Sequence, residues 1–235
     1  MSDILILTHT DHCTPGHLAQ VLRAQQLDYQ VLRVDRGELA GVDLDRPKAV
    51  AIMGGAMSVN DPLPWLTTEV AAIQHFLQRD IPMIGHCLGG QLLAKALGAE
   101  VRTMAFQEVG WQRLQHTAQA ANSPWLRHVP GEFELFQWHG DTFDLPPGAQ
   151  HLLTNGWCQN QAFTWGDKVL ALQSHPEMTA ELVDLWLTEA GYLLDASQPS
   201  QQSISFMREN LPVRIAQLNQ VAEGFYRHWL QLAFA

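Results

Sequence analysis

One ten-residue stretch decides how this chain folds, and it reads Pro82, Met83, Ile84, Gly85, His86, Cys87, Leu88, Gly89, Gly90, Gln91. Its apolar start predicts a buried strand, small residues surround Cys87, and the composition that follows is typical of a helix. Strand, sharp turn and helix in this order are typical of a nucleophile elbow. A thiol there lies at the N-terminal end of a helix, where free backbone N–H groups favour the thiolate and can stabilise an oxyanion. We therefore expect Cys87 to be a nucleophile; the alternative is an inert buried cysteine.

Strands and helices alternate on the N-terminal side of this stretch. The pattern predicts strands over Ile4–Thr8, Tyr29–Val34 and Ala49–Met53, and helices over His17–Gln26 and Trp65–Arg79. This alternation predicts an α/β fold, a flavodoxin-like doubly wound and mostly parallel sheet with helices on both faces. Active sites in such sheets lie at the carboxyl ends of the strands, where Gly54, Gly55 and Cys87 all fall.

The C-terminal half follows a different pattern. Short aromatic segments predict an added region of strands, several of them antiparallel, over Gly110–Leu114, Glu132–Trp138, His151–Thr154, Gln161–Trp165 and Val169–Gln173. Helix is predicted again from Thr179, and apolar residues at steps of three and four from Ile204 to Trp229 predict a last helix, which Pro212 starts or kinks.

The stretch from Asp195 to Ser205, rich in Ser, Gln and Pro, is the best candidate for a linker. We therefore expect one main domain over residues 1–194, with residues 195–235 forming a linker and C-terminal helices. The apolar stripe of these helices predicts docking on the same domain; a surface for a partner protein is the alternative.

Composition excludes several classes of protein. A formal net charge of −10 over 235 residues and a pI of about 5.4 argue against a nucleic-acid partner. The N-terminus is not basic, and its apolar run Ile4–Leu7 is too short for a signal or membrane segment, so we expect a cytoplasmic protein without a membrane partner. Three cysteines do not suggest a disulfide framework, and reduced thiols are expected.

A reactive thiol needs a base, and His175 is the best candidate. It follows the apolar run Val169–Leu172, and Pro176 favours an extended backbone in which His175 and Glu177 point to the same side. The carboxylate can then orient the imidazole for acyl transfer through a thioester. Outside this group we expect Cys13 and Cys158 to be structural. His9, His12 and His17, which lie near Asp11, match no zinc spacing and are expected in a solvated loop.

Several motifs resemble those of the class I, or triad, glutamine amidotransferases. Gly85–Gln91 resembles their G-x-C-x-G-x-Q elbow, Gln173–Glu177 resembles their His-Pro-Glu signature, and Met53–Val59 resembles their Gly-Gly-Pro loop, with Ala56 in place of the proline. Further segments are similar to stand-alone amidotransferases of the kind found in the glutaminase domain of GMP synthase: Asn60–Pro62, Pro64–Leu66, Glu108–Trp111, Trp138–Phe143, Leu145–Pro146 and Asn160–Phe163. The resemblance covers about residues 3 to 187.

The resemblance implies a role for each matching residue. Cys87 would be the nucleophile, His175 the general base and acid, and Glu177 the group that orients it. The backbone amides of Gly55 and Leu88 would form the oxyanion hole. The amino-acid end of glutamine would be held by Gln91 and by a turn at His139, Gly140 and Asp141; the alternative is that Asp141 only forms the turn and that Trp138 and Phe143 are core residues.

The resemblance also implies a reaction: hydrolysis of the γ-amide of glutamine to glutamate and ammonia, without a metal or cofactor. Family members pass the ammonia to a synthase, and we expect no second domain of adequate size and find no glycine-rich phosphate loop in this chain. Either a separate synthase subunit accepts the ammonia, or the transfer role has been abandoned. Two alternatives stay open. The first is a hydrolase of γ-glutamyl peptides or amines that uses the same triad, and the second is a regulatory or binding subunit with a vestigial site.

Overall fold

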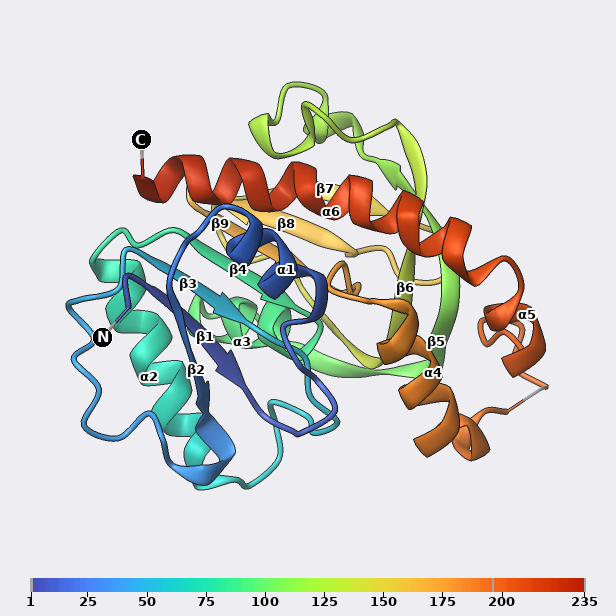
Figure 1. Cartoon of the computed structure of the whole chain (residues 1–235), viewed down its shortest axis with the longest axis horizontal. Helices are drawn as coiled ribbons and strands as arrows, with labels where there is room; N and C mark the ends of the chain where they lie inside the picture. The colour runs from blue at the N-terminus through green and yellow to red at the C-terminus, as the bar shows by residue number, and fades with distance from the viewer. Residues whose placement is uncertain (1, 196, 235) are drawn as a thin grey trace.

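A mixed sheet of nine strands lies at the centre of the computed structural model, which describes residues 2–195 and 197–234 (Figure 1). The strand order is β2-β1-β3-β4-β9-β8-β7-β5-β6. One half is parallel and consists of β2 (Tyr29–Arg33), β1 (Ile4–Thr8), β3 (Ala49–Ile52), β4 (Met83–His86) and β9 (Val169–Leu172). The other half is antiparallel and consists of β8 (Ala162–Trp165), β7 (Ala149–Thr154), β5 (Val101–His116) and β6 (Glu132–Phe143). The predicted α/β fold with an added antiparallel region is confirmed.

Helices cover both faces of the parallel half. On one face lie α1 (Gly16–Ala24), α4 (Ala180–Glu189) and α6 (Leu211–Phe234), and on the other α2 (Pro64–Gln78) and α3 (Leu88–Ala96). β1 shows how one strand serves both layers, because Ile4 and Ile6 join the first core while Leu5 and Leu7 join the second. A short helix α5 (Ile204–Arg208) precedes α6, and single 3₁₀ turns are η1 (Val34–Arg36), η2 (Ala118–Ala120), η3 (Pro124–Leu126) and η4 (Gly191–Leu193). None of the helices in the described residues has both the length and the apolar composition needed to cross a membrane.

The β5–β6 ribbon is longer than its sequence indicates. β5 begins nine residues before the predicted Gly110, and β6 continues through His139, Gly140 and Asp141 to Phe143. The prediction of a turn at His139–Asp141 was therefore wrong. Turn-type residues stay extended there because β5 keeps pairing with β6 on both sides of a register shift between Thr103 and Glu108.

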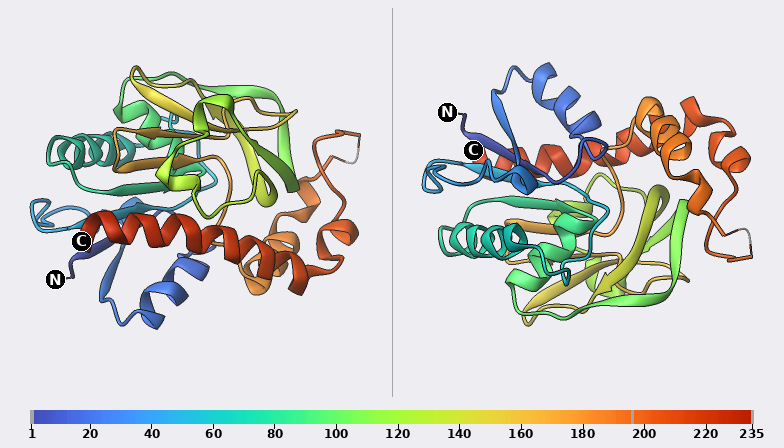
Figure 2. Two further views of the ribbon diagram at one scale, coloured as in Figure 1. Left: turned by 90° about the horizontal axis from the view of Figure 1, so that it is seen from above. Right: turned by 90° about the horizontal axis from the view of Figure 1, so that it is seen from below.

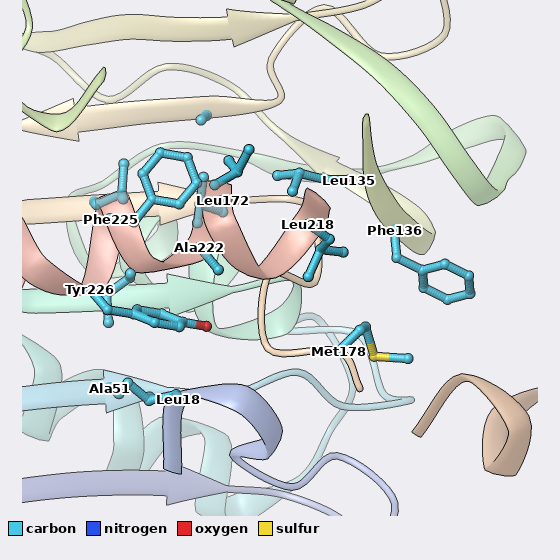
Figure 3. Packing of buried hydrophobic residues seen from close by; sticks show 14 of the residues in the cluster. Leu18, Ala51, Leu135, Phe136, Leu172, Met178, Leu218, Ala222, Phe225 and Tyr226 are labelled. Atoms are coloured by element: carbon cyan, nitrogen blue, oxygen red, sulfur yellow. The ribbon is translucent and has the colours of Figure 1, made fainter. Parts of the chain in front are cut away.

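The C-terminal apolar stripe forms two helices rather than one. The chain leaves α5 and passes through Asn210, which has a φ of 52°, before α6 begins at Leu211, with Pro212 as its second residue. α6 then runs along the face of the sheet (Figures 1 and 2). In Figure 3 its residues Leu218, Ala222 and Phe225 lie among core residues of that face. The stripe is therefore buried against this chain.

The segment predicted as a linker is attached to the sheet. Ser200 is fully buried and its Oγ donates to the carbonyl of Gln107 at 2.7 Å, while Gln201 forms an isolated parallel bridge with Val109. One residue of the predicted linker, Ala196, lies outside the described residues. The predicted domain boundary near residue 194 stays a prediction.

Candidate active site

Cys87 is the single residue between β4 and α3. Its φ of 48° and ψ of −108° are unusual for a residue with a side chain, and such a backbone costs about 1–3 kcal/mol. Two hydrogen bonds hold it there: its N–H donates to the carbonyl of Leu172 at 2.8 Å, and its own carbonyl accepts from the N–H of Gln91 at 3.0 Å. The predicted elbow therefore exists, with Cys87 at its tip and 5% exposed.

The glycines of the elbow allow α3 to approach the sheet closely. A Cβ at Gly89 would lie 2.1 Å from the carbonyl oxygen of Ile52, at the end of β3. A Cβ at Gly90 would lie 2.5 Å from the carbonyl oxygen of Leu172, at the end of β9. Both contacts are with backbone atoms, which cannot move aside as a side chain does, so these positions require glycine.

His175 is held in place from three directions just after β9. Its backbone N–H donates to the carbonyl of Phe136 at 2.9 Å, and its Nδ1 donates to Oε1 of Glu177 at 2.8 Å. The ring of Trp186 packs edge-on against the imidazole, with centroids 4.7 Å apart. The sequence therefore predicted correctly that Glu177 lies on the same side as His175.

Neighbouring groups determine the protonation states of the buried pair His175 and Glu177. Burial by itself lowers the pKa of His175, but the Glu177 carboxylate and Cys87 in its thiolate form raise that pKa to about 10. Burial alone would raise the pKa of Glu177, but His175 and His86 hold the pKa of this carboxyl well below its usual range. The structure therefore supports an imidazolium beside a carboxylate at neutral pH.

Cys87 and His175 both lie against the position that a side chain on Gly54 would occupy. A Cβ on Gly54 would lie 2.8 Å from Cε1 of His175 and 3.7 Å from Cβ of Cys87. Nε2 of His175 is buried and has no hydrogen-bond partner among the described residues, and the thiol of Cys87 lies 3.8 Å from the carbonyl oxygen of Trp138. The structure thus brings Cys87, His175 and Glu177 together, and leaves Nε2 available to exchange a proton.

The two predicted oxyanion donors are neighbours. Leu88 is the first residue of α3, where backbone N–H groups have no partner within the helix. A Cβ on Gly55 would lie 2.6 Å from the side chain of Leu88, and the N–H of Gly55 donates no hydrogen bond within the described part of the chain. Both amides are therefore free for a ligand, and their role in an oxyanion hole stays a prediction.

The residues predicted to bind the amino-acid end of glutamine converge on Asp141. Its backbone carbonyl accepts from Nε2 of Gln91 at 3.3 Å and from Nε2 of Gln173 at 2.7 Å, and Nδ1 of His139 lies 2.9 Å from it. Gly140, between them, leaves room for Gln107, whose side chain would lie 3.2 Å from a Cβ. Gln91, His139, Gly140 and Asp141 thus share one place, and their contact with substrate stays a prediction.

The carboxylate of Asp141 ties two segments together. It accepts from Oγ of Ser58 at 2.6 Å and from Oγ1 of Thr103 at 2.8 Å. Ser58 belongs to the loop after β3 that contains Gly54 and Gly55, and Thr103 belongs to β5. Asp141 therefore links the proposed oxyanion loop to the antiparallel ribbon.

A buried polar cluster lies next to this network. The ligand-type atoms of Glu108, His139 and Cys158 lie within 4.8 Å of one another. Both oxygens of Glu108 already accept hydrogen bonds, Oε2 from His139 at 3.0 Å and from Gln161 at 2.7 Å, and Oε1 from Asn155. Burial raises the pKa of Cys158 to about 11, which keeps this thiol protonated. These potential ligand atoms already take part in internal hydrogen bonds. Such an arrangement is typical of a rigid polar network rather than of a metal site.

Two buried histidines of this region, His86 and His9, were not predicted from the sequence to belong to the site. Nδ1 of His86 lies 3.0 Å from Oε2 of Glu177, close enough for electrostatic attraction although not aligned as a hydrogen bond. The expectation of a solvated loop was wrong for His9, whose side chain is buried and contacts Gly54 and Glu69, and for His17, which is a buried residue of α1. Only tertiary contacts reveal the roles of His86 and His9, because the residues that these two histidines contact lie far from them along the chain. Cys13 is also buried, which raises its pKa to about 12.

Fold and site together define an α/β protein with a cysteine at a nucleophile elbow, backed by a buried His–Glu pair. Residues 15–192 match the glutamine amidotransferase class-I family, and the chain belongs to that family. The predicted resemblance is therefore confirmed.

Known relatives agree with this assignment. A glutamine amidotransferase-like protein, YfeJ of Salmonella typhimurium, is 26% identical over 86% of this chain and 85% of its own length. GMP synthase [glutamine-hydrolyzing] of Thermomicrobium roseum is 33% identical over 56% of this chain, but the match covers only 24% of that enzyme. Among solved structures, a glutamine amidotransferase from Methylobacillus flagellatus is 40% identical over 97% of this chain and 94% of its own, with a TM-score of 0.92. Another from Thermotoga maritima is 28% identical over 95% and 97%, with a TM-score of 0.80.

Proposed function

We propose that this protein hydrolyses the γ-amide of glutamine and releases glutamate and ammonia. The observation that carries this proposal is that Cys87 and His175 both lie against Gly54, with Glu177 bound to Nδ1 of the imidazole. Membership of the glutamine amidotransferase class-I family supports glutamine as the substrate. Related GMP synthases are described as glutamine-hydrolysing, which supports the same reaction.

The proposed reaction has two halves. The Cys87 thiolate attacks the γ-carbonyl carbon, and the carbonyl oxygen becomes an oxyanion facing the amides of Gly55 and Leu88. The carbon–nitrogen bond then breaks, and His175 gives its proton to the departing nitrogen, which leaves as ammonia. A water next attacks the γ-glutamyl thioester while His175 takes one of its protons. Glutamate leaves, and the site returns to thiolate and imidazolium.

We propose further that a separate protein accepts the ammonia. The match to the GMP synthase of Thermomicrobium roseum covers 24% of that enzyme, and the match to the GMP synthase of Aeropyrum pernix covers 29%. This chain therefore corresponds to only a part of such enzymes. Pull-down of the native protein, followed by identification of a co-purifying synthase, tests this part of the proposal.

Turnover by Cys87→Ala tests the nucleophile. Loss of the thiol is expected to lower kcat for glutamine hydrolysis by at least about 10⁴-fold, because the thioester cannot form without it. Cys13→Ala is the matched control, since it removes a buried thiol that lies outside the elbow. Intact hydrolysis in Cys87→Ala would contradict the assignment.

A panel of substrates tests the leaving group. Glutamine is expected to be turned over at least as well as γ-glutamyl peptides and γ-glutamyl alkylamides. A strong preference for one of those compounds would replace the glutaminase proposal with a γ-glutamyl hydrolase. A glutamine-like electrophile should also label Cys87 stoichiometrically, and a failure to label would indicate a vestigial site.

A further inference from the structure

His9 is a fully enclosed histidine that the reaction above does not use. It directly follows β1, at the same edge of the sheet as Cys87, and is 1% exposed. Its Nδ1 lies 3.0 Å from the carbonyl oxygen of Gly54, and its Nε2 lies 2.9 Å and 3.0 Å from the two oxygens of Glu69. The ring also stacks on Trp65, at 5.5 Å between centroids and 20° between planes. These contacts hold the side chain in one orientation.

Both ring nitrogens of His9 face acceptors. A peptide carbonyl can only accept, so Nδ1 must carry the hydrogen that bonds to Gly54. Nε2 faces a carboxylate with no exposed side-chain surface, which is stable in the interior only when paired. Burial alone lowers the pKa of His9, but Glu69 outweighs it and raises this pKa. His9 and Glu69 therefore form a buried imidazolium–carboxylate pair whose charged donor is directed at Gly54.

The carbonyl that His9 holds belongs to the peptide whose N–H is that of Gly55. A trans peptide is planar, and its C=O and N–H point in opposite directions. Anchoring the Gly54 oxygen on His9 therefore turns the Gly55 N–H away from His9. The same two glycines also lie against the elbow. A Cβ on Gly54 would approach Cys87 and His175, and one on Gly55 would approach the side chain of Leu88 as well as Cβ of His9.

We propose that the His9–Glu69 pair is a positioning device that fixes the Gly54–Gly55 peptide so that the Gly55 N–H faces the oxyanion formed at Cys87. This inference rests on the proposed function. His9 does not touch the substrate; it acts through one peptide plane. Glu69 keeps the imidazole charged and in place, so the donor is ready before substrate arrives and needs no reorganisation during the reaction.

Two double variants isolate this role. The first, His9→Leu/Glu69→Leu, is called the leucine variant below, and it removes the donor without leaving a buried unpaired carboxylate. The second, His9→Asn/Glu69→Leu, is called the asparagine variant. It has the same change at position 69, but the amide that it introduces, which has nearly the shape of a leucine side chain, can still donate to the Gly54 carbonyl. The exposed pair of His75 with Asp45 gives the control variant His75→Leu, which changes a histidine of α2 outside the site.

Three measurements read the outcome. The leucine variant should lose about 10- to 100-fold in kcat for glutamine with little change in KM, and the asparagine variant should keep most of kcat. Alkylation of Cys87 by iodoacetamide builds no oxyanion, so its rate should stay within about twofold of the unmodified protein in both variants. Crystal structures should show the Gly54 carbonyl turned in the leucine variant and unchanged in the asparagine variant.

Each contrary result has a distinct meaning. Equal kcat in the asparagine and leucine variants, or alkylation that falls in parallel with hydrolysis, would overturn the positioning role. An unchanged Gly54–Gly55 peptide in the crystal structure of the leucine variant would overturn it as well, whatever the activity. If the unmodified protein hydrolyses no γ-glutamyl amide, the proposed function fails, while the crystal structures still decide whether His9 sets the peptide.

Discussion

Glu177 serves two histidines at once. One oxygen accepts from His175 at 2.8 Å, and the other lies 3.0 Å from His86, the residue directly before Cys87. A carboxylate shared in this way cannot turn, since each oxygen has its own neighbour. Its charge also helps to raise the pKa of the His175 imidazole to about 10, so this ring is protonated at neutral pH. One buried carboxylate thus sets both the orientation and the charge of the proposed acid–base group.

Replacing Glu177 by Gln should change the pH profile of hydrolysis. Removing the negative charge destabilises the imidazolium, so the pKa of His175 should fall and the alkaline limb of kcat should move to lower pH by about 1–3 units. Steady-state rates from about pH 6 to about pH 10.5 would measure the shift. Glu181→Gln, at an exposed carboxylate in the first turn of α4, should leave the limb in place. If the alkaline limb of kcat stays at the same pH in Glu177→Gln, a group other than His175 determines that limb.

At the scale of elements, the elbow depends on how closely α3 approaches the sheet. Gly89 and Gly90 let the first turn of α3 contact the backbone ends of β3 and β9 directly. This contact places the N-terminus of the helix, with its free N–H groups, beside Cys87. Helix propensity would favour alanine at both positions, so packing has overruled it here.

The same substitution at two helical glycines should therefore have opposite effects. Gly89→Ala places a Cβ 2.1 Å from the Ile52 carbonyl oxygen and should lower the free energy of unfolding by about 1–3 kcal/mol or more. Gly224→Ala, on α6, meets no described atom closer than 3.6 Å and should raise it by about 0.5–1 kcal/mol. Urea denaturation of both variants measures the pair. A stabilised Gly89→Ala would show that α3 can move outward without cost.

At the scale of the whole molecule, the last helix covers the strands that carry the site. α6 packs over the face of the sheet (Figure 1), and its residue Trp229 is fully buried. Nε1 of Trp229 donates to the carbonyl of Pro82 at 3.0 Å, just before β4, the strand that leads to Cys87. The last helix therefore supports the strand that leads to the site.

Truncation of Trp229 should measure that contribution. Trp229→Ala should cost about 3–5 kcal/mol of unfolding free energy, as for other large core residues. Trp229→Phe retains most of the apolar ring and should cost less, because the Pro82 carbonyl still accepts from the N–H of Val50. Thermal and urea unfolding, followed by circular dichroism, would compare the two. Equal and small losses would show that α6 is only loosely attached.

The elements with strong periodicity were predictable. β1 was predicted at its observed bounds, and α2 within one residue at each end, because apolar runs between turn residues leave few alternatives. The lengths of β5 and β6 were not predictable, since pairing across the ribbon keeps polar residues and Gly140 extended. The apolar stripe is interrupted at Asn210, and the last helix begins beside Pro212, the residue predicted to start or kink it.

The sequence by itself determined the α/β class, the elbow at Cys87 and the pairing of His175 with Glu177, because these depend on residues close together in the chain. Only the tertiary structure decided that His86 flanks Glu177, that Asp141 ties Ser58 to Thr103, and that His9 and Glu69 hold Gly54. These contacts join residues far apart along the chain, so no local pattern encodes them. Burial then gives them their strength, since a charged hydrogen bond in the interior is screened far less than one in water.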